Sequence, residues 1–141
     1  MTFPHQPASQ PRAGAARARA RVRLAACRRH EVAVPFRVHG SVVEDESGRP
    51  LAGLLVRAYD EDLVLDDHLG DARTDVQGRF EVVFTEVQFM DAFETRPDLY
   101  LRVFDASGSR LLLTTEHEVR ADAEPDERFE LRIPRERLAA R

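Results

Sequence analysis

Apolar and polar residues alternate in short stretches between residues 36 and 133, and turn-forming residues separate these stretches. A period of two places every second side chain on the same face of a β-strand. Glycine, proline, aspartate and serine, the residues that favour turns, gather at 44–50, 75–78 and 106–109. The pattern therefore predicts seven short strands, at residues 36–42, 54–59, 72–74, 79–85, 98–105, 111–115 and 129–133.

Seven short strands with regular turns predict an all-β domain, a seven-stranded antiparallel β-sandwich. Its interior is expected to bring together Val42, Val56, Val82, Val103 and Leu131. The chain shows no alternation of strands with helices, which argues against a parallel, doubly wound sheet.

The insert at 86–94 breaks the alternation. Its apolar residues are spaced as on a helix, because Phe89 and Phe93 are four positions apart and Thr85 is suited to cap the first turn. The sequence predicts one short helix here. It either plugs the end of the sandwich or offers an apolar face to a partner.

Charge is divided unevenly along the chain. Residues 1–30 hold seven of the 21 basic residues, all of them arginine, and no acid. Residues 31–141 hold 14 arginines and all 25 acidic residues, a net charge of −11 with histidine neutral. We therefore predict a disordered Arg/Ala/Pro-rich tail at 1–33, a β-sandwich domain at 34–135 and a frayed C-terminus at 136–141. The tail also resembles an organelle transit peptide, or an arm that docks on an acidic surface.

Composition excludes several chemistries. One cysteine, Cys27, cannot form an internal disulfide or a paired-cysteine zinc site. No apolar run is long enough for a membrane span, and an acidic domain is a poor partner for nucleic acid. No phosphate-cradling glycine loop or nucleophile elbow occurs. We expect no enzymatic activity, no cofactor and a cytoplasmic location.

The densest cluster of ionisable groups is the acidic loop predicted at 60–71. Asp60, Asp62 and Asp67 lie in a pattern similar to the loop of calcium-dependent membrane-binding domains of the synaptotagmin type. Calcium takes six to eight oxygen ligands, so these three residues are candidate calcium ligands. The alternatives are a solvated acidic rim, with Leu63, Val64 and Leu65 packed into the sandwich, and a docking site for a basic partner.

If consecutive strands run antiparallel, loops alternate between the two ends of the domain. The connections at 60–71, 86–98 and 116–127 would then share one end. The turns at 44–50, 75–78 and 105–109 would share the other.

Two turns and their flanking strands carry a recognisable motif. It reads G-x-V-x-(loop)-G-x-P-L-x-G-x-x-V-x-A followed by T-D-x-x-G-x-F. The matching residues are Gly40, Val42, Gly48, Pro50, Leu51, Gly53, Val56, Ala58, Thr74, Asp75, Gly78 and Phe80. From Phe36 to Pro134 the chain resembles the transthyretin-like and carboxypeptidase regulatory-like domains. The resemblance implies a prealbumin-like, broadly Ig-like sandwich used as an accessory, binding or structural module.

An enzymatic branch of that family hydrolyses hydroxyisourate and ends in Tyr-Arg-Gly-Ser, whereas this chain ends in Leu-Ala-Ala-Arg. We therefore expect a non-enzymatic module that acts through protein–protein contacts or self-association, without a small-molecule substrate. A calcium-binding module and an enzyme of unrecognised kind remain the alternatives.

Overall fold

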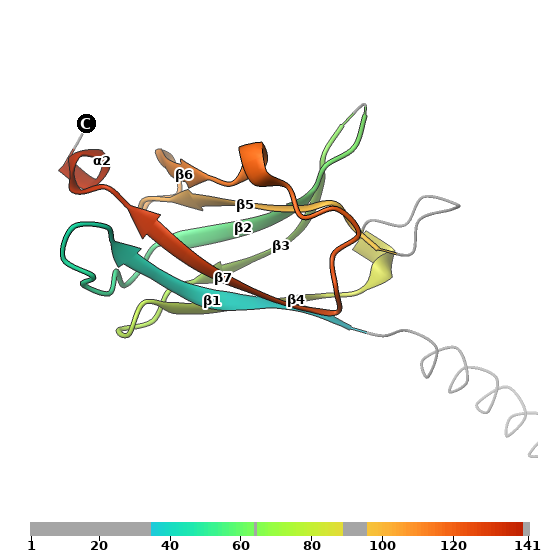
Figure 1. Cartoon of the computed structure of the whole chain (residues 1–141), viewed down its shortest axis with the longest axis horizontal. Coiled ribbons are helices and arrows are strands. Elements are labelled where there is room, and N and C mark those ends of the chain that lie inside the picture. Colours follow the sequence, from blue (N-terminus) through green and yellow to red (C-terminus); the bar gives the residue numbers. More distant parts are fainter. Residues whose placement is uncertain (1–34, 64, 89–95, 140–141) are drawn as a thin grey trace, which may run out of the picture. The chain divides into compact units, whose positions relative to one another are not determined.

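The computed structural model describes residues 35–63, 65–88 and 96–139, and within them seven strands form two sheets (Figure 1). The predicted all-β class and the number of strands are confirmed. The strands are β1 Phe36–Glu44, β2 Leu55–Asp60, β3 Asp67–Arg73, β4 Arg79–Phe84, β5 Leu99–Phe104, β6 Leu111–Thr114 and β7 Asp126–Ile133. Two 3-10 turns, η1 Glu86–Gln88 and η2 Glu116–Glu118, and the helix α2 Arg135–Ala139 complete the described elements. The tail predicted to be disordered, residues 1–33, lies outside the described residues.

Strand order is β4-β1-β7 in one sheet and β3-β2-β5-β6 in the other. All pairs are antiparallel except β1 with β7, which run parallel with His39 opposite Arg128. The prediction of a purely antiparallel arrangement is therefore wrong for this pair. A period of two looks the same in either strand direction, and the first and last strands are too far apart in the chain for a turn to fix their orientation.

The third strand is also longer than predicted, because β3 begins at Asp67 rather than at residue 72. Leu69 is the one buried side chain in this strand, so no alternating pattern marks its first half. Edge strands commonly carry charged residues, and β3 pairs with β2 alone within its sheet.

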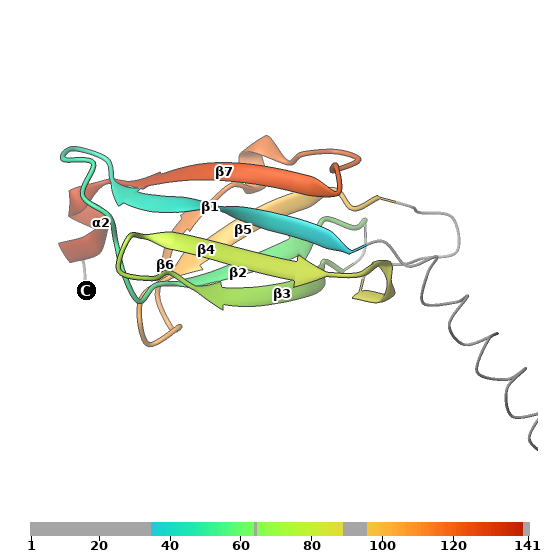
Figure 2. The ribbon, with the colours of Figure 1, turned by 90° about the horizontal axis from the view of Figure 1, so that it is seen from below.

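The core lies between the two sheets, which overlap face to face in Figure 2. The five residues predicted to meet in the interior are 0–4% exposed and belong to one apolar cluster. Burial of apolar side chains from both layers is the main term that stabilises such a domain.

The turn at 75–78 is held close to β1. Gly78 has φ +75°, and a Cβ there would lie 2.5 Å from the carbonyl oxygen of Val42. The carboxylate of Asp75 accepts hydrogen bonds from the backbone of Gln77 and Arg79, both at 2.9 Å. This position therefore requires glycine, and the Asp-x-x-Gly spacing of the sequence motif has a direct structural cause.

Glu44 is a buried carboxylate at the end of β1, 4% exposed. Its Oε1 accepts hydrogen bonds from Ser47 Oγ at 2.7 Å and Arg135 Nη2 at 2.9 Å, and its Oε2 accepts one from Arg49 Nη2 at 3.2 Å. The helix α2 covers part of the segment predicted to fray, and Arg135 at its start pairs with this carboxylate. Residues 140–141 lie outside the described part.

Acid should remove this ion pair. The bond from Arg135, with help from Ser47 and Arg49, lowers the pKa of Glu44 from an ordinary 4.5 to about 2. A carboxyl whose pKa is lower in the folded state stabilises the fold above its unfolded value, and this contribution is lost as the pH falls from 4.5 through 2. The free energies of unfolding of Glu44→Gln and the wild type, measured in urea, should therefore differ at pH 6 and become equal towards pH 2.

Glu130→Gln is the control for this titration, because that side chain is 74% exposed. Its stability difference from the wild type should be small at every pH. A Glu44→Gln difference that stays constant between pH 6 and pH 2 would contradict the assignment.

Candidate functional site

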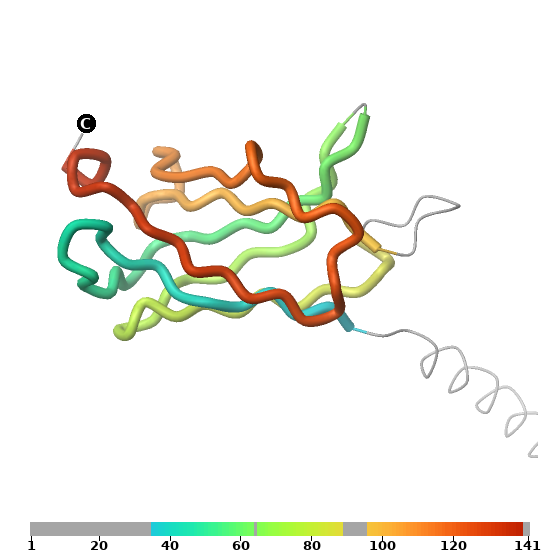
Figure 3. Tube along the Cα trace, in the orientation of Figure 1, coloured from blue at the N-terminus to red at the C-terminus, as the bar shows by residue number. Residues whose placement is uncertain are grey.

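One end of the domain, hereafter the acidic end, gathers the connections 61–66, 96–98 and 115–125 (Figures 1 and 3). Asp98 joins them, since its carbonyl accepts the backbone N–H of Glu61 at 2.8 Å and its Oδ1 accepts that of Asp122 at 3.0 Å. The predicted convergence of these connections is confirmed. The opposite end carries the predicted turns, with Arg73 donating a 2.9 Å hydrogen bond to the carbonyl of Ala106.

The acidic hairpin, residues 60–67, projects from this end (Figure 1). A β-bulge between Ala58 and Tyr59 shifts the β2–β3 register just before it. Such a bulge bends and twists a strand pair. Asp66 closes the loop, because its Oδ1 accepts a 3.1 Å hydrogen bond from the backbone N–H of Asp62. Its Oδ2 accepts a 2.5 Å bond from the hydroxyl of Tyr100 on β5.

Tyr100 is fixed by the neighbours that cover it. It is 1% exposed, stacks on Tyr59 with 5.2 Å between ring centroids, and lies under the Arg102 guanidinium at 5.5 Å. Burial and the bond to Asp66 raise the pKa of Tyr100 above its ordinary value, while this bond lowers the pKa of Asp66. Tyr100 therefore stays protonated and Asp66 stays ionised, and the bond between them holds the base of the hairpin to β5.

The candidate calcium ligands occupy different surroundings. Asp60 is 2% exposed and its Oδ1 accepts the backbone N–H of Asp98 at 2.7 Å. Asp67 pairs with Asp60 in the register of β2 and β3. Asp62 is exposed, and its Oδ1 accepts the backbone N–H of Leu63 at 2.6 Å. Among the described residues, no three His, Cys, Asp or Glu side chains are grouped to hold a metal ion. Calcium binding stays a prediction, and it requires a rise in Tm when calcium is added.

The tip of the hairpin is apolar and exposed. Leu63 is 101% exposed and Leu65 is 77% exposed, so the alternative in which these two side chains pack into the sandwich is wrong. Val64 lies outside the described residues. The hydrogen bond from the backbone of Asp62 to Asp66 links the two sides of the hairpin beside these leucines.

The predicted helix at 86–94 is described only in its first residues. They form the 3-10 turn η1, in which Gln88 Oε1 accepts the backbone N–H of Thr85 at 2.8 Å. Val87 in this turn is 80% exposed. The rest of the predicted helix, residues 89–95, lies outside the described part.

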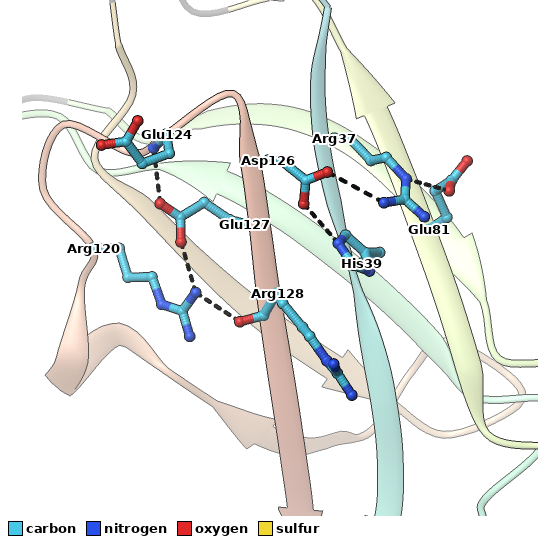
Figure 4. A network of polar contacts seen from close by, with 8 residues as sticks. All are labelled: Arg37, His39, Glu81, Arg120, Glu124, Asp126, Glu127 and Arg128. Atoms are coloured by element: carbon cyan, nitrogen blue, oxygen red, sulfur yellow. Dashed lines mark hydrogen bonds and ion pairs between the residues drawn. The ribbon is translucent and has the colours of Figure 1, made fainter.

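A hollow of about 520 Å³ lies over the β4-β1-β7 sheet and extends to the end of β3, at Ala72 and Arg73. Residues pointing outward from all three strands form part of its wall. Arg37 donates to Glu81 at 2.6 Å and to Asp126 at 3.3 Å, and His39 Nε2 donates to Asp126 at 2.7 Å (Figure 4). The bond from His39, followed by that from Arg37, holds the pKa of Asp126 below its ordinary value. Composition alone did not predict this hollow, because its lining comes from separate strands.

No family model matches the chain, and no curated protein matches it. Its structure is similar to part of a 9R-lipoxygenase from Cyanothece PCC8801, with 23% identity, a TM-score of 0.57, and coverage of 72% of this chain and 17% of that one. This likeness shows a shared fold.

Two further solved structures match at TM-scores below 0.5. One is the dioxygenase domain of a dioxygenase carbohydrate-binding protein fusion from Streptomyces sp. SirexAA-E, with 17% identity, a TM-score of 0.44, and coverage of 72% of this chain and 80% of that one. The other is chlorocatechol 1,2-dioxygenase from Pseudomonas putida, with 16% identity, a TM-score of 0.45, and coverage of 73% of this chain and 61% of that one. In the described part of the chain, no helix has the length and apolar character needed to cross a membrane.

Proposed function

We propose that this domain is a non-enzymatic binding module that docks on a partner protein through the acidic hairpin. The observation that carries the proposal is the exposure of Leu63 and Leu65 at the tip of a projecting loop. Two large apolar side chains together in water are costly unless a partner covers them.

The hairpin base is preorganised for such a contact. Tyr100 and Asp98 bond to the side chains of Asp66 and Asp60, so the loop enters a complex with part of its ordering entropy already lost. The acids beside the tip favour a partner surface of positive charge around an apolar site.

Three carboxylates with lowered pKa values each bind a structural partner, which supports a non-enzymatic role. Glu44 binds Arg135 of α2, Asp66 closes the hairpin, and Asp105 accepts bonds from Ser107 and from the backbone of the turn before β6.

We also propose that the two-sheet fold is prealbumin-like. The motif glycines support it, because Gly48, Gly53 and Gly78 all have φ between +74° and +78° at the turns where the family pattern places glycine. An experimental structure superposed on transthyretin-like domains tests this, and strands without counterparts would contradict it.

Photo-crosslinking tests the docking proposal. A photoreactive residue replaces Leu65 at the hairpin tip, or Val76 at the opposite end as a control with 85% exposure. In cells that express the full chain, position 65 should give a discrete adduct and position 76 should not. Equal labelling from both positions, or no adduct from position 65, would overturn the proposal. The mass of an adduct also separates a foreign partner from a second copy.

A further inference from the structure

The hollow on the β4-β1-β7 sheet is cationic in an otherwise acidic domain. Its lining contains four arginines and two acids, namely Arg37, Arg73, Arg79, Arg128, Asp75 and Glu81. Residues 31–141 as a whole carry a net charge of −11. A local excess of positive charge on such a domain makes this face the one that attracts an anionic group.

The guanidinium groups of two of these arginines are free to bind a further carboxylate. Within the described residues Arg79 has no ion pair, and Arg128 has only a 3.5 Å contact with Glu130 in which both side chains are more than two-thirds exposed. They lie on the two strands that flank β1, with Arg79 opposite Ser41 and Arg128 opposite His39. Guanidinium groups on both sides of the hollow suit a carboxylate-bearing chain that lies between them.

The rest of the wall is fixed and partly apolar. Arg37 and His39 are held by the ion pairs with Glu81 and Asp126. Ala72 and Phe80 contribute apolar atoms beside the arginines. An occupant that carries both carboxylates and aliphatic side chains would match this lining.

The acidic hairpin carries both carboxylates and aliphatic side chains. Between residues 60 and 67 it carries five acids and no basic residue, and Leu63 and Leu65 are exposed. It cannot enter the hollow of its own domain. Tyr100 and Asp98 tie its base to β5 at the start of β3, whereas the hollow reaches only the far end of β3, at Ala72 and Arg73, and otherwise lies over the β4-β1-β7 sheet.

We propose that the hollow receives the acidic hairpin of a second copy of this chain, with the hairpin carboxylates paired to Arg79 and Arg128. The inference rests on the proposed function and names the partner. Because the two surfaces are different, the contact is heterologous and each copy offers one of each. Association should therefore extend head to tail, and it should weaken as salt screens the charges.

Charge reversal tests this contact in the full chain. The hollow variant carries Arg79→Glu and Arg128→Glu, and the hairpin variant carries Glu61→Arg and Asp62→Arg. Single-site controls are Arg132→Glu, on the same sheet face outside the hollow, and Glu118→Arg, in η2 outside the hairpin. Sedimentation velocity is recorded over a concentration series at 20 mM and 500 mM NaCl.

The wild type and both controls should associate at low salt, and either double variant should weaken association by about tenfold or more. An equal mixture of the two variants should associate again at low salt, although each variant alone does so only weakly. The intact hairpin of the hollow variant fits the intact hollow of the hairpin variant, and the two reversed surfaces are again opposite in charge. This mixture also shows that both variants are folded.

Three results would overturn the inference. They are a wild type that stays monomeric at every concentration, a hollow variant that associates as the wild type does, and a mixture that does not associate. If any of these occurs while position 65 still crosslinks to a different protein, the proposed function stands and the second copy is not its partner. If position 65 also gives no adduct, both proposals fail.

Discussion

Replacing Gly40 with alanine should destabilise the domain by about 3 kcal/mol or more. A Cβ at this position would lie 1.8 Å from the carbonyl oxygen of Phe129 on β7. The atom in the way is backbone, so no side-chain rotation relieves the contact. Since β1 is the central strand of its sheet, moving it away from β7 disturbs both layers. Urea unfolding followed by circular dichroism measures the loss.

Gly53→Ala is the matched control. Gly53 has φ +78°, but an added Cβ would meet nothing within 4 Å. It should cost only the backbone strain of a left-handed alanine, about 1–2 kcal/mol. If Gly40→Ala costs no more than Gly53→Ala, β1 and β7 do not approach as closely as the structure has them.

The Gly40 result also bears on function. Arg37 and His39 precede this glycine on β1 and form one wall of the hollow. A displaced β1 would move both residues relative to Glu81 and Asp126. The close approach of β1 to β7 therefore supports the geometry on which the proposed contact between copies depends.

Local pattern was sufficient to predict most of the fold. Val38, Phe80 and Leu131 each lie between two polar neighbours, so their burial could be predicted without knowing which strands pair. The same pattern could not give the parallel pairing of β1 with β7, because strand direction depends on how the chain crosses between the sheets. It also missed the start of β3, where Leu69 is the one buried side chain.

The candidate site was only partly predictable. The density of acids at 60–71 marked the hairpin, and the rule of alternating loops placed it with the other acidic connections. The engagement of Asp60 by the backbone of Asp98 and of Asp66 by Tyr100 could not be predicted, because these contacts join residues 38 and 34 positions apart. Tyr100 also has no distinct sequence signal, because Leu99 and Leu101 on either side of it are buried as well.

Alanine substitutions of two leucines should distinguish a residue that stabilises the fold from one that contributes to docking. Leu101 is 0% exposed in the centre of β5, so Leu101→Ala should cost about 2–5 kcal/mol through lost burial and the cavity left behind. Leu63 is fully exposed, and Leu63→Ala should change stability by no more than about 0.5 kcal/mol. Thermal or urea unfolding of the two variants measures this difference.

The docking readout should show the reverse order. With the photoreactive residue at position 65, Leu63→Ala should reduce the adduct strongly, because it removes apolar surface that a partner covers. Leu101→Ala should keep the adduct at temperatures below its own Tm, since the hairpin is held by Tyr100 and Asp98 rather than by Leu101. If Leu63→Ala destabilises the fold as much as Leu101→Ala, or leaves the adduct unchanged, the exposed tip is not the docking element.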